Sequence, residues 1–239
     1  MSEYTPQLEQ STNETQSTSF ADESSLQRYL LERTLATSGS RYCWARREMP
    51  IGNRIPDVVM VSFQQAPPYE RWPRRFSFRY AAVMAVLRNR PNVTIDTVAR
   101  RCFDRVDRIA EIVSDLLRAG TIEEGRPGVL RLSPAVTELQ VDVTAIEAKL
   151  TRWSEALTQA RSYMGFADDV FVALDTSLVI SNKVLEAFRA SGVGLWKTSQ
   201  ECLTPILPAC RRSSWTAEKE YVVASVMVGR SSTLWKLAP

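Results

Sequence analysis

The chain has 239 residues, of which 44% are hydrophobic and 24% are charged, and it contains no histidine. This length suits one large domain or two small ones, and the apolar fraction is sufficient for a core. The absence of histidine excludes Ser-His-Asp and Cys-His triads, His-ligated zinc or iron, and imidazole general-base catalysis. Any chemistry therefore depends on carboxylates, Lys, Arg, Tyr, Ser or Cys.

The net charge of +3 is unevenly distributed along the chain. Residues 1–25 carry five acids and no Lys or Arg, whereas residues 71–131 carry thirteen Arg against seven acids, a balance of +6. This asymmetry indicates a basic face for a polyanion. The four cysteines form no CxxC pair, and the sequence shows no N-terminal apolar segment and no 18-residue apolar run. We therefore expect a cytoplasmic protein that does not associate with a membrane.

The first third of the chain predicts a tail, a helix and a hairpin. Residues 1–20 are rich in Ser, Thr, Gln and Glu, which is typical of a disordered tail. A helix follows, with its N-cap near Asp22 or Ser24. Two β runs, residues 42–49 and 54–63, flank a Gly-Asn pair and predict a hairpin. The second run is almost continuously apolar, which favours a strand buried on both faces.

A Pro-rich joint separates this hairpin from a segment of different composition, residues 67–134. The segment predicts three helices and then a short hairpin with a turn that contains Gly and Pro, at residues 78–88, 95–103, 106–119 and 121–132. Three short helices followed by a hairpin is the order of a winged helix. The segment resembles bacterial winged helix-turn-helix modules.

The remainder of the chain predicts an α/β domain. We expect strands and helices to alternate, with strands at residues 141–150, 169–174 and 194–197 and helices at residues 153–163, 184–190 and 217–228. This βαβα order is typical of a sheet with helices packed on it.

Glu147 and Lys149 are charged residues near the end of the apolar strand expected at residues 141–150. Because side chains alternate between the faces of a strand, Glu147 and Lys149 point the same way. Burial of a carboxylate and an ammonium is costly unless they pair with each other or bind something. The pattern of an acid two residues before a Lys is weak by itself, but its position on a core strand raises its significance. The alternative is a cross-strand ion pair at a sheet edge.

Together these elements resemble the PD-(D/E)xK nuclease superfamily, which has the restriction-endonuclease-like fold. The resemblance rests on Asp57 in the hairpin, on Glu147 and Lys149 in the next strand, and on the helix that follows. It implies an α/β fold with a mixed sheet flanked by helices, formed by residues 21–66 and 135–239. About ninety residues separate Asp57 from Glu147, far more than the family usually has. Insertion of the winged-helix segment between two adjacent strands accounts for the excess, because the flanking ends can stay close.

The resemblance also implies a metal site. Asp57 and Glu147, with the backbone carbonyl of Ala148, are expected to hold Mg²⁺ or Mn²⁺ through hard oxygen ligands. The metal polarises the scissile phosphate and lowers the pKa of an attacking water. Lys149 is expected to orient that water or to stabilise the charge that develops on the phosphate. The alternative for Asp57 is a turn or strand-end residue.

Three further residues match positions that are frequent in the family. Gln159 and Tyr163 lie on the expected helix after the Glu147 strand, and Gln159 is expected to position the phosphate. Glu32, on the first helix, matches an upstream acid that helps to bind the metal. A solvated position on a helix is the alternative for Glu32, and helix packing is the alternative for Gln159 and Tyr163.

Arginines of the winged-helix segment predict contacts with DNA phosphates, namely Arg100, Arg101, Arg105, Arg108, Arg126 and Arg131. Acids alternate with several of them, so a solvated helix with i,i+4 ion pairs is the alternative. The favoured hypothesis is a metal-dependent DNA endonuclease, in which a homodimer is possible. A non-catalytic DNA-binding protein on a nuclease-like scaffold is the second hypothesis, and an adaptor that binds no nucleic acid is the third.

Overall fold

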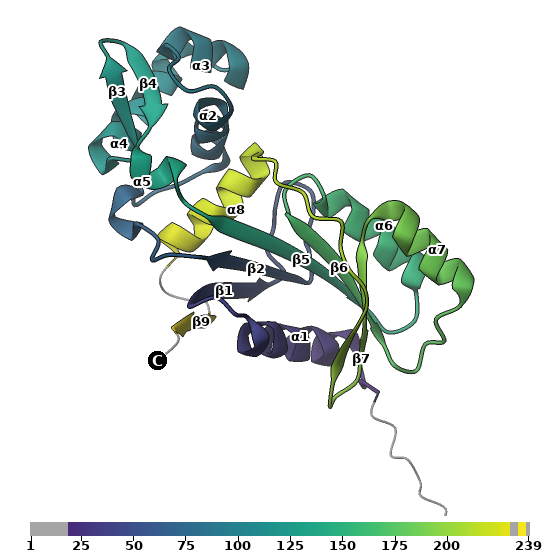
Figure 1. The fold of residues 1–239 in the computed structure, drawn as a ribbon. Helices are drawn as coiled ribbons and strands as arrows, with labels where there is room; N and C mark the ends of the chain where they lie inside the picture. Colours follow the sequence, from purple (N-terminus) through teal and green to yellow (C-terminus); the bar gives the residue numbers. More distant parts are fainter. Residues whose placement is uncertain (1–18, 230–233, 238–239) are drawn as a thin grey trace, which may run out of the picture.

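The computed structural model describes residues 19–229 and 234–237 (Figure 1). The predicted disordered tail lies outside the described residues, apart from Ser19 and Phe20. Phe20 is only 8% exposed, and its N–H donates a 2.9 Å hydrogen bond to Asp175 Oδ2. The end of the predicted tail therefore belongs to the packed structure, because an aromatic ring gains more from burial than the polar residues before it.

A seven-stranded mixed sheet organises the chain, in the order β8-β7-β6-β5-β2-β1-β9. In that order the strands are Leu203–Leu207, Gly194–Thr198, Asp169–Asp175, Val141–Lys149, Val58–Phe63, Tyr42–Arg47 and Leu234–Leu237. The central strand β5 is antiparallel to β2 and parallel to β6. The predicted α/β class is confirmed, and β5, which carries Glu147 and Lys149, lies in the middle of the sheet instead of at its edge.

Helices cover both faces of this sheet (Figure 1). Helix α1 (Glu23–Thr37) packs Leu26 and Leu30 against Ile146 of β5. Helices α6 (Trp153–Tyr163) and α7 (Asn182–Ser191) belong to the larger core, which includes Val143 of β5 and therefore lies on the other face. The N-cap of α1 is Asp22, as predicted, since its Oδ1 accepts a 2.7 Å hydrogen bond from the Ser25 N–H.

Strands β2 and β5 are neighbours in the sheet, but in the sequence a helical unit is inserted between them. It begins after a 3-10 turn, Tyr69–Arg71, and contains α2 (Phe78–Asn89), α3 (Ile95–Cys102), α4 (Val106–Ala119), the hairpin strands β3 (Ile122–Arg126) and β4 (Val129–Leu132), and α5 (Pro134–Thr137). A bridge between Val93 and Leu130 joins the α2–α3 loop to the hairpin. The two ends of the inserted segment meet, because the Gln64 N–H donates a 3.2 Å hydrogen bond to the Gln140 carbonyl.

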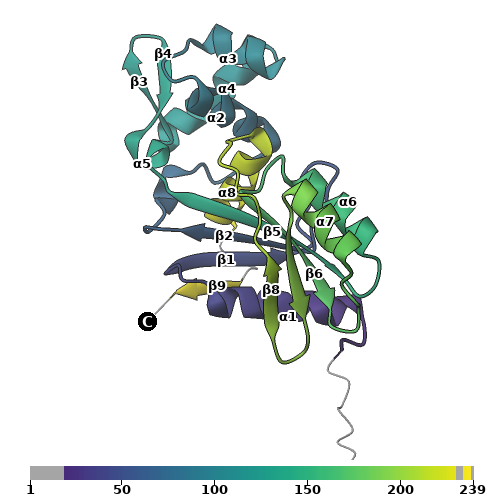
Figure 2. The same ribbon diagram turned by 45° about the vertical axis from the view of Figure 1, so that its right-hand side comes forward.

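Helix α8 (Ala217–Val228) packs between the helical unit and the sheet, against α2 (Figure 2). The apolar residues of α2 and α8 join the core of the α6 face. Two buried ion pairs reinforce this junction: Arg88 of α2 with Glu220, and Lys219 with Asp168, both at 2.5 Å. The helical unit is therefore fixed to the sheet by a shared core.

Several elements differ from the sequence-based expectation. Strand β2 begins at Val58, so Asp57 precedes the strand instead of lying within it. Strands β8 and β9 were not predicted. Within residues 19–229 and 234–237, no helix has the length and apolar character needed to cross a membrane.

Candidate functional site

The start of β2 and the end of β5 bring three predicted site residues together. Val58 pairs with Ile146, so Asp57 lies beside the last residues of β5. Its Oδ2 accepts a 2.7 Å hydrogen bond from the Ala148 N–H. This N–H has no partner strand to bond because β2 has not yet begun, and the Asp57 carboxylate takes the place of that strand.

Glu147 lies almost wholly buried next to Asp57, with an exposed fraction of 1%. Its Oε1 lies 3.4 Å from Lys149 Nζ, and its Oε2 accepts a 2.7 Å hydrogen bond from the Tyr163 hydroxyl of α6. The expected proximity of Glu147 and Lys149 on one side of the strand is present. Tyr163, for which the sequence allows either a site role or helix packing, contacts the site directly.

Helix α1 adds two residues that the sequence did not suggest. Glu23 Oε2 accepts a 3.2 Å hydrogen bond from Lys149 Nζ, and Gln27 Nε2 donates a 2.6 Å hydrogen bond to Asp57 Oδ1. Gln27 is in turn held by Arg47, which donates to its Oε1 at 3.0 Å. Glu23 and Gln27 are four residues apart and share a helix face. The spacing of these two polar residues, directly after the Asp22 N-cap, is the sequence signal that could have identified them as site residues.

Burial and mutual repulsion perturb the two carboxylates. Burial, followed by the charge of Asp57, raises the pKa of Glu147 to about 7. Burial also raises the pKa of Asp57, although the Ala148 N–H and the Lys149 charge oppose the increase. Burial would lower the pKa of Lys149, but the Glu147 and Glu23 carboxylates outweigh it and the pKa is raised. Lys149 therefore remains a cation, while Asp57 and Glu147 are costly to ionise.

Such a pair of acids is a favourable ligand set for a hard cation, whose charge would relieve the repulsion. Each of the four oxygens of Asp57 and Glu147 accepts one bond from the protein, which leaves further lone pairs. The Ala148 carbonyl faces the same gap as its N–H, because both groups of a strand residue point to one side. In the described part of the chain, no cluster of three or more Cys, Asp or Glu residues is arranged to hold a metal. Any ion here would take its other ligands from water or substrate.

Two predicted residues lie outside this cluster. Glu32 is exposed on α1, nine residues beyond Glu23 and therefore about 14 Å further along the helix axis. Gln159 is exposed on α6, one turn before Tyr163. Neither side chain forms a contact with Asp57, Glu147 or Lys149 in the described structure. The upstream acid that reaches the site is Glu23, because the N-terminal turn of α1, not its middle, lies over the strand ends.

The predicted DNA-contacting arginines divide into two groups. Three of them form ion pairs within the protein: Arg105 with Asp107 at 2.7 Å, Arg108 with Asp104 at 3.6 Å and Arg131 with Glu123 at 2.6 Å. The other three form no ion pair among the residues that the structure describes, namely Arg100, Arg101 and Arg126. The alternative of a solvated helix with ion pairs therefore fits Arg105 and Arg108, at the start of α4, and does not fit Arg100 and Arg101 of α3.

Comparison of the chain with protein-family models, curated proteins and solved structures found no match.

Proposed function

We propose that this protein is a metal-dependent phosphodiesterase that cleaves DNA. The observation that carries the proposal is the convergence of Asp57, Glu147 and Lys149 at the end of the central strand, with Asp57 bonded to the Ala148 N–H at 2.7 Å and Glu147 paired with Lys149 at 3.4 Å. The three residues are the ones that the PD-(D/E)xK pattern identifies. The β1–β2 hairpin supplies Asp57 and the central strand β5 supplies Glu147 and Lys149, in the order that the pattern requires.

The finer fold assignment is part of this proposal. The sheet of β1, β2, β5 and β6, with α1 on one face and α6 on the other, supports a restriction-endonuclease-like core. The unit inserted between β2 and β5 has the element order of a winged helix, and the bridge from Val93 to Leu130 adds a third short β segment beside its hairpin. We assign it the role of positioning DNA.

Asp57, Glu147 and the Ala148 carbonyl would hold Mg²⁺ or Mn²⁺. Bound there, the ion would polarise the scissile phosphate and acidify an attacking water. Mg²⁺ commonly uses one or two carboxylates with water and phosphate as its remaining ligands, so two carboxylates are sufficient. The raised pKa values of both acids, caused first by burial and at Glu147 also by the charge of Asp57, support this assignment, because a bound cation would offset the cost of ionising them.

The remaining residues position the reacting groups. Lys149, 9% exposed and held between Glu147 and Glu23, can orient a water or stabilise the negative charge that develops on the phosphate. Tyr163 fixes the Glu147 carboxylate from α6, and Gln27 fixes Asp57 from α1. Such supporting hydrogen bonds hold ligands in a productive orientation.

The test is cleavage of supercoiled plasmid with Mg²⁺ or Mn²⁺. We expect nicked or linear product from the wild type, and none from Asp57→Asn or Lys149→Met. Glu32→Gln is the matched control, because it neutralises an exposed acid of α1 outside the cluster, and it should cleave like the wild type. A wild type that binds DNA yet cuts none of it with either metal refutes the proposal.

One observation favours a second candidate, a DNA-binding protein that retains the nuclease-like scaffold without catalysis. Every oxygen of Asp57 and Glu147 already has a protein donor, which lowers the need for a metal. In that case Glu147→Ala leaves DNA binding unchanged or tighter, since it removes a negative charge, and no metal supports cleavage.

A further inference from the structure

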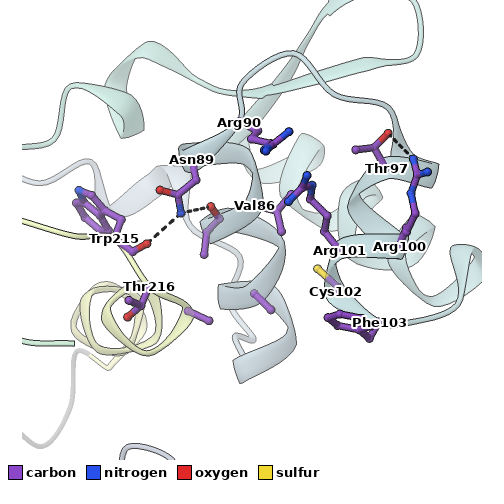
Figure 3. Close-up of a pocket in the computed structure, with 13 residues that line it drawn as sticks. Val86, Asn89, Arg90, Thr97, Arg100, Arg101, Cys102, Phe103, Trp215 and Thr216 are labelled. Carbon is purple, nitrogen blue, oxygen red and sulfur yellow. Dashed lines mark hydrogen bonds between the residues drawn. The ribbon is translucent and has the colours of Figure 1, made fainter. Parts of the chain in front are cut away.

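A groove with a volume of about 870 Å³ lies between α2, α3 and the start of α8 (Figure 3). Arg90 lies at the end of α2, Arg100, Arg101 and Phe103 lie along α3 and its C-cap, and Trp215 precedes α8 on the opposite side. The small side chains of Ala82 and Ala85 and the side chain of Val86 form its apolar floor. The groove is separate from the carboxylate cluster at the end of β5.

The charge in this groove is of one sign. Its described lining contains three Arg and no Asp or Glu, and none of Arg90, Arg100 and Arg101 forms an ion pair in the part of the chain that the structure describes. Arg100 makes only a long hydrogen bond, 3.4 Å to the Thr97 hydroxyl. In a protein with 27 acids, three exposed and unpaired arginines that line one groove indicate a site for an anion that comes from outside the chain.

Two aromatic residues accompany the arginines. Phe103 is 98% exposed, and it ends α3 with φ of +52°, a left-handed conformation that an aromatic residue rarely adopts. Neither packing nor backbone preference accounts for a phenyl ring held in solvent there. Trp215 is fixed by the Arg88 guanidinium, which lies 3.8 Å from its ring centroid, so it offers a rigid wall.

Arginines interleaved with aromatic rings over an apolar floor fit a polynucleotide whose bases are unstacked. Phosphates pair with the guanidinium groups, and bases stack on aromatic faces with little dependence on sequence. An intact duplex offers phosphates but keeps its base faces inside the stack, and an acidic peptide offers carboxylates without planar rings. The exposed ring of Phe103 therefore favours single-stranded DNA.

We propose that this groove binds an unpaired DNA strand, with Arg90, Arg100 and Arg101 on its phosphates and Phe103 stacked on a base. The inference rests on the proposed function in that it takes DNA as the substrate. It assigns the DNA strand to the face formed by α2 and α3. By analogy with other winged helices, DNA would instead be expected on the third helix, α4, but Arg105 and Arg108 there are already paired with acids.

The test is the fluorescence anisotropy of labelled oligo(dT) with the full chain in EDTA, so that cleavage does not interfere. We expect Arg90→Gln, Arg100→Gln and Arg101→Gln together to reduce the slope of log Kd against log salt concentration by about 2, since each lost phosphate contact on a single strand contributes about 0.7. The matched control is Arg105→Gln, Arg108→Gln and Arg131→Gln together. It changes the net charge equally but removes paired arginines, so its slope should match that of the wild type.

A further variant, Phe103→Asn, tests stacking, because Asn tolerates the left-handed backbone and lacks the aromatic ring. We expect about tenfold weaker binding, the loss typical of one stacked base, with an unchanged salt slope. Equal effects of the two triple variants overturn the inference. So does tighter binding of blunt duplex than of oligo(dT), or equal competition by polyglutamate, which would indicate an acidic protein partner.

The two proposals can fail separately. If the protein binds oligo(dT) through the groove but never cuts DNA with metal, the phosphodiesterase proposal is refuted and the groove proposal is supported. If the protein cuts plasmid DNA and the groove variants bind and cut like the wild type, the phosphodiesterase proposal is supported and the groove proposal is refuted.

Discussion

The buried carboxylate of Glu147 leads to a quantitative expectation for stability without metal. Its pKa is raised from 4.5 to about 7, first by burial and then by the charge of Asp57. A shift of this size corresponds to a cost on the order of 3 kcal/mol for holding the charged form in the folded protein. Glu147→Gln removes the charge and retains the shape. We expect it to raise the free energy of unfolding above pH 7 by up to about 3 kcal/mol.

The expected gain depends on pH in a defined direction. The folded-state pKa of Glu147 is raised, so the folded protein binds the proton more tightly than the unfolded chain does. The contribution of this group is therefore fully present below about pH 4.5 and is lost as the pH rises through about 7. The difference between Glu147→Gln and the wild type should be near zero at the acidic end and should reach its full size by about pH 8.

Thermal unfolding in EDTA between about pH 4 and pH 8 measures this difference. For a chain of this size 1 kcal/mol corresponds to about 2–4 °C, so we expect Glu147→Gln to melt up to roughly 10 °C higher at pH 8. Glu155→Gln, an exposed acid on α6 paired with Arg152, is the control and should show no such trend. A pH-independent difference, or a less stable variant at pH 8, refutes the reasoning.

The remaining predictions concern the metal, the role of α1 and the buried ion pairs. Mg²⁺ at a hundred times its dissociation constant should stabilise the wild type by about 2.7 kcal/mol and should not stabilise Asp57→Asn, as thermal unfolding can measure; no effect on the wild type contradicts the metal site. Glu23→Gln should reduce the cleavage rate about tenfold by releasing Lys149, whereas Glu32→Gln should not, and equal rates for the two variants would show that Glu23 has no part in the site. Asp168→Ala should cost about 3–5 kcal/mol in urea unfolding, because it leaves a buried ammonium unpaired; a cost below 1 kcal/mol would mean that the ion pair is dispensable.

The long elements were predictable because local signals and tertiary packing agree. Helix α8 has the expected bounds, Ala217–Val228, and Asp22 is the N-cap of α1. Strand β8 was missed because Leu203–Leu207 contains Pro205, which weakens a strand pattern and is tolerated only at an edge. The hairpin was expected, but Asp57 was placed inside its second strand because the apolar run begins earlier than the ladder does.

The site was predictable where it lies on strands and less so where it lies on helices. Alternation along β5 places Glu147 and Lys149 together without any knowledge of the rest of the fold. A helix offers several acids, and the sequence alone does not say which turn faces the sheet. The resemblance therefore points to Glu32, whereas Glu23 is the acid that reaches Lys149. Gln27 could not be predicted as a site residue either, because its partner Asp57 is thirty residues away in sequence.

The placement of the helical unit between β2 and β5 has a consequence for how the chain folds. Pairing of these two strands requires closure of residues 64–140, which as a flexible loop costs about 4 kcal/mol of entropy. The unit is made of short-range helix and hairpin contacts, which form quickly. Once folded, it holds Gln64 next to Gln140 and starts the β2–β5 ladder at the end opposite the carboxylates. We therefore expect the strands to pair from the inserted unit toward Asp57 and Glu147, so that the costly acids come together last.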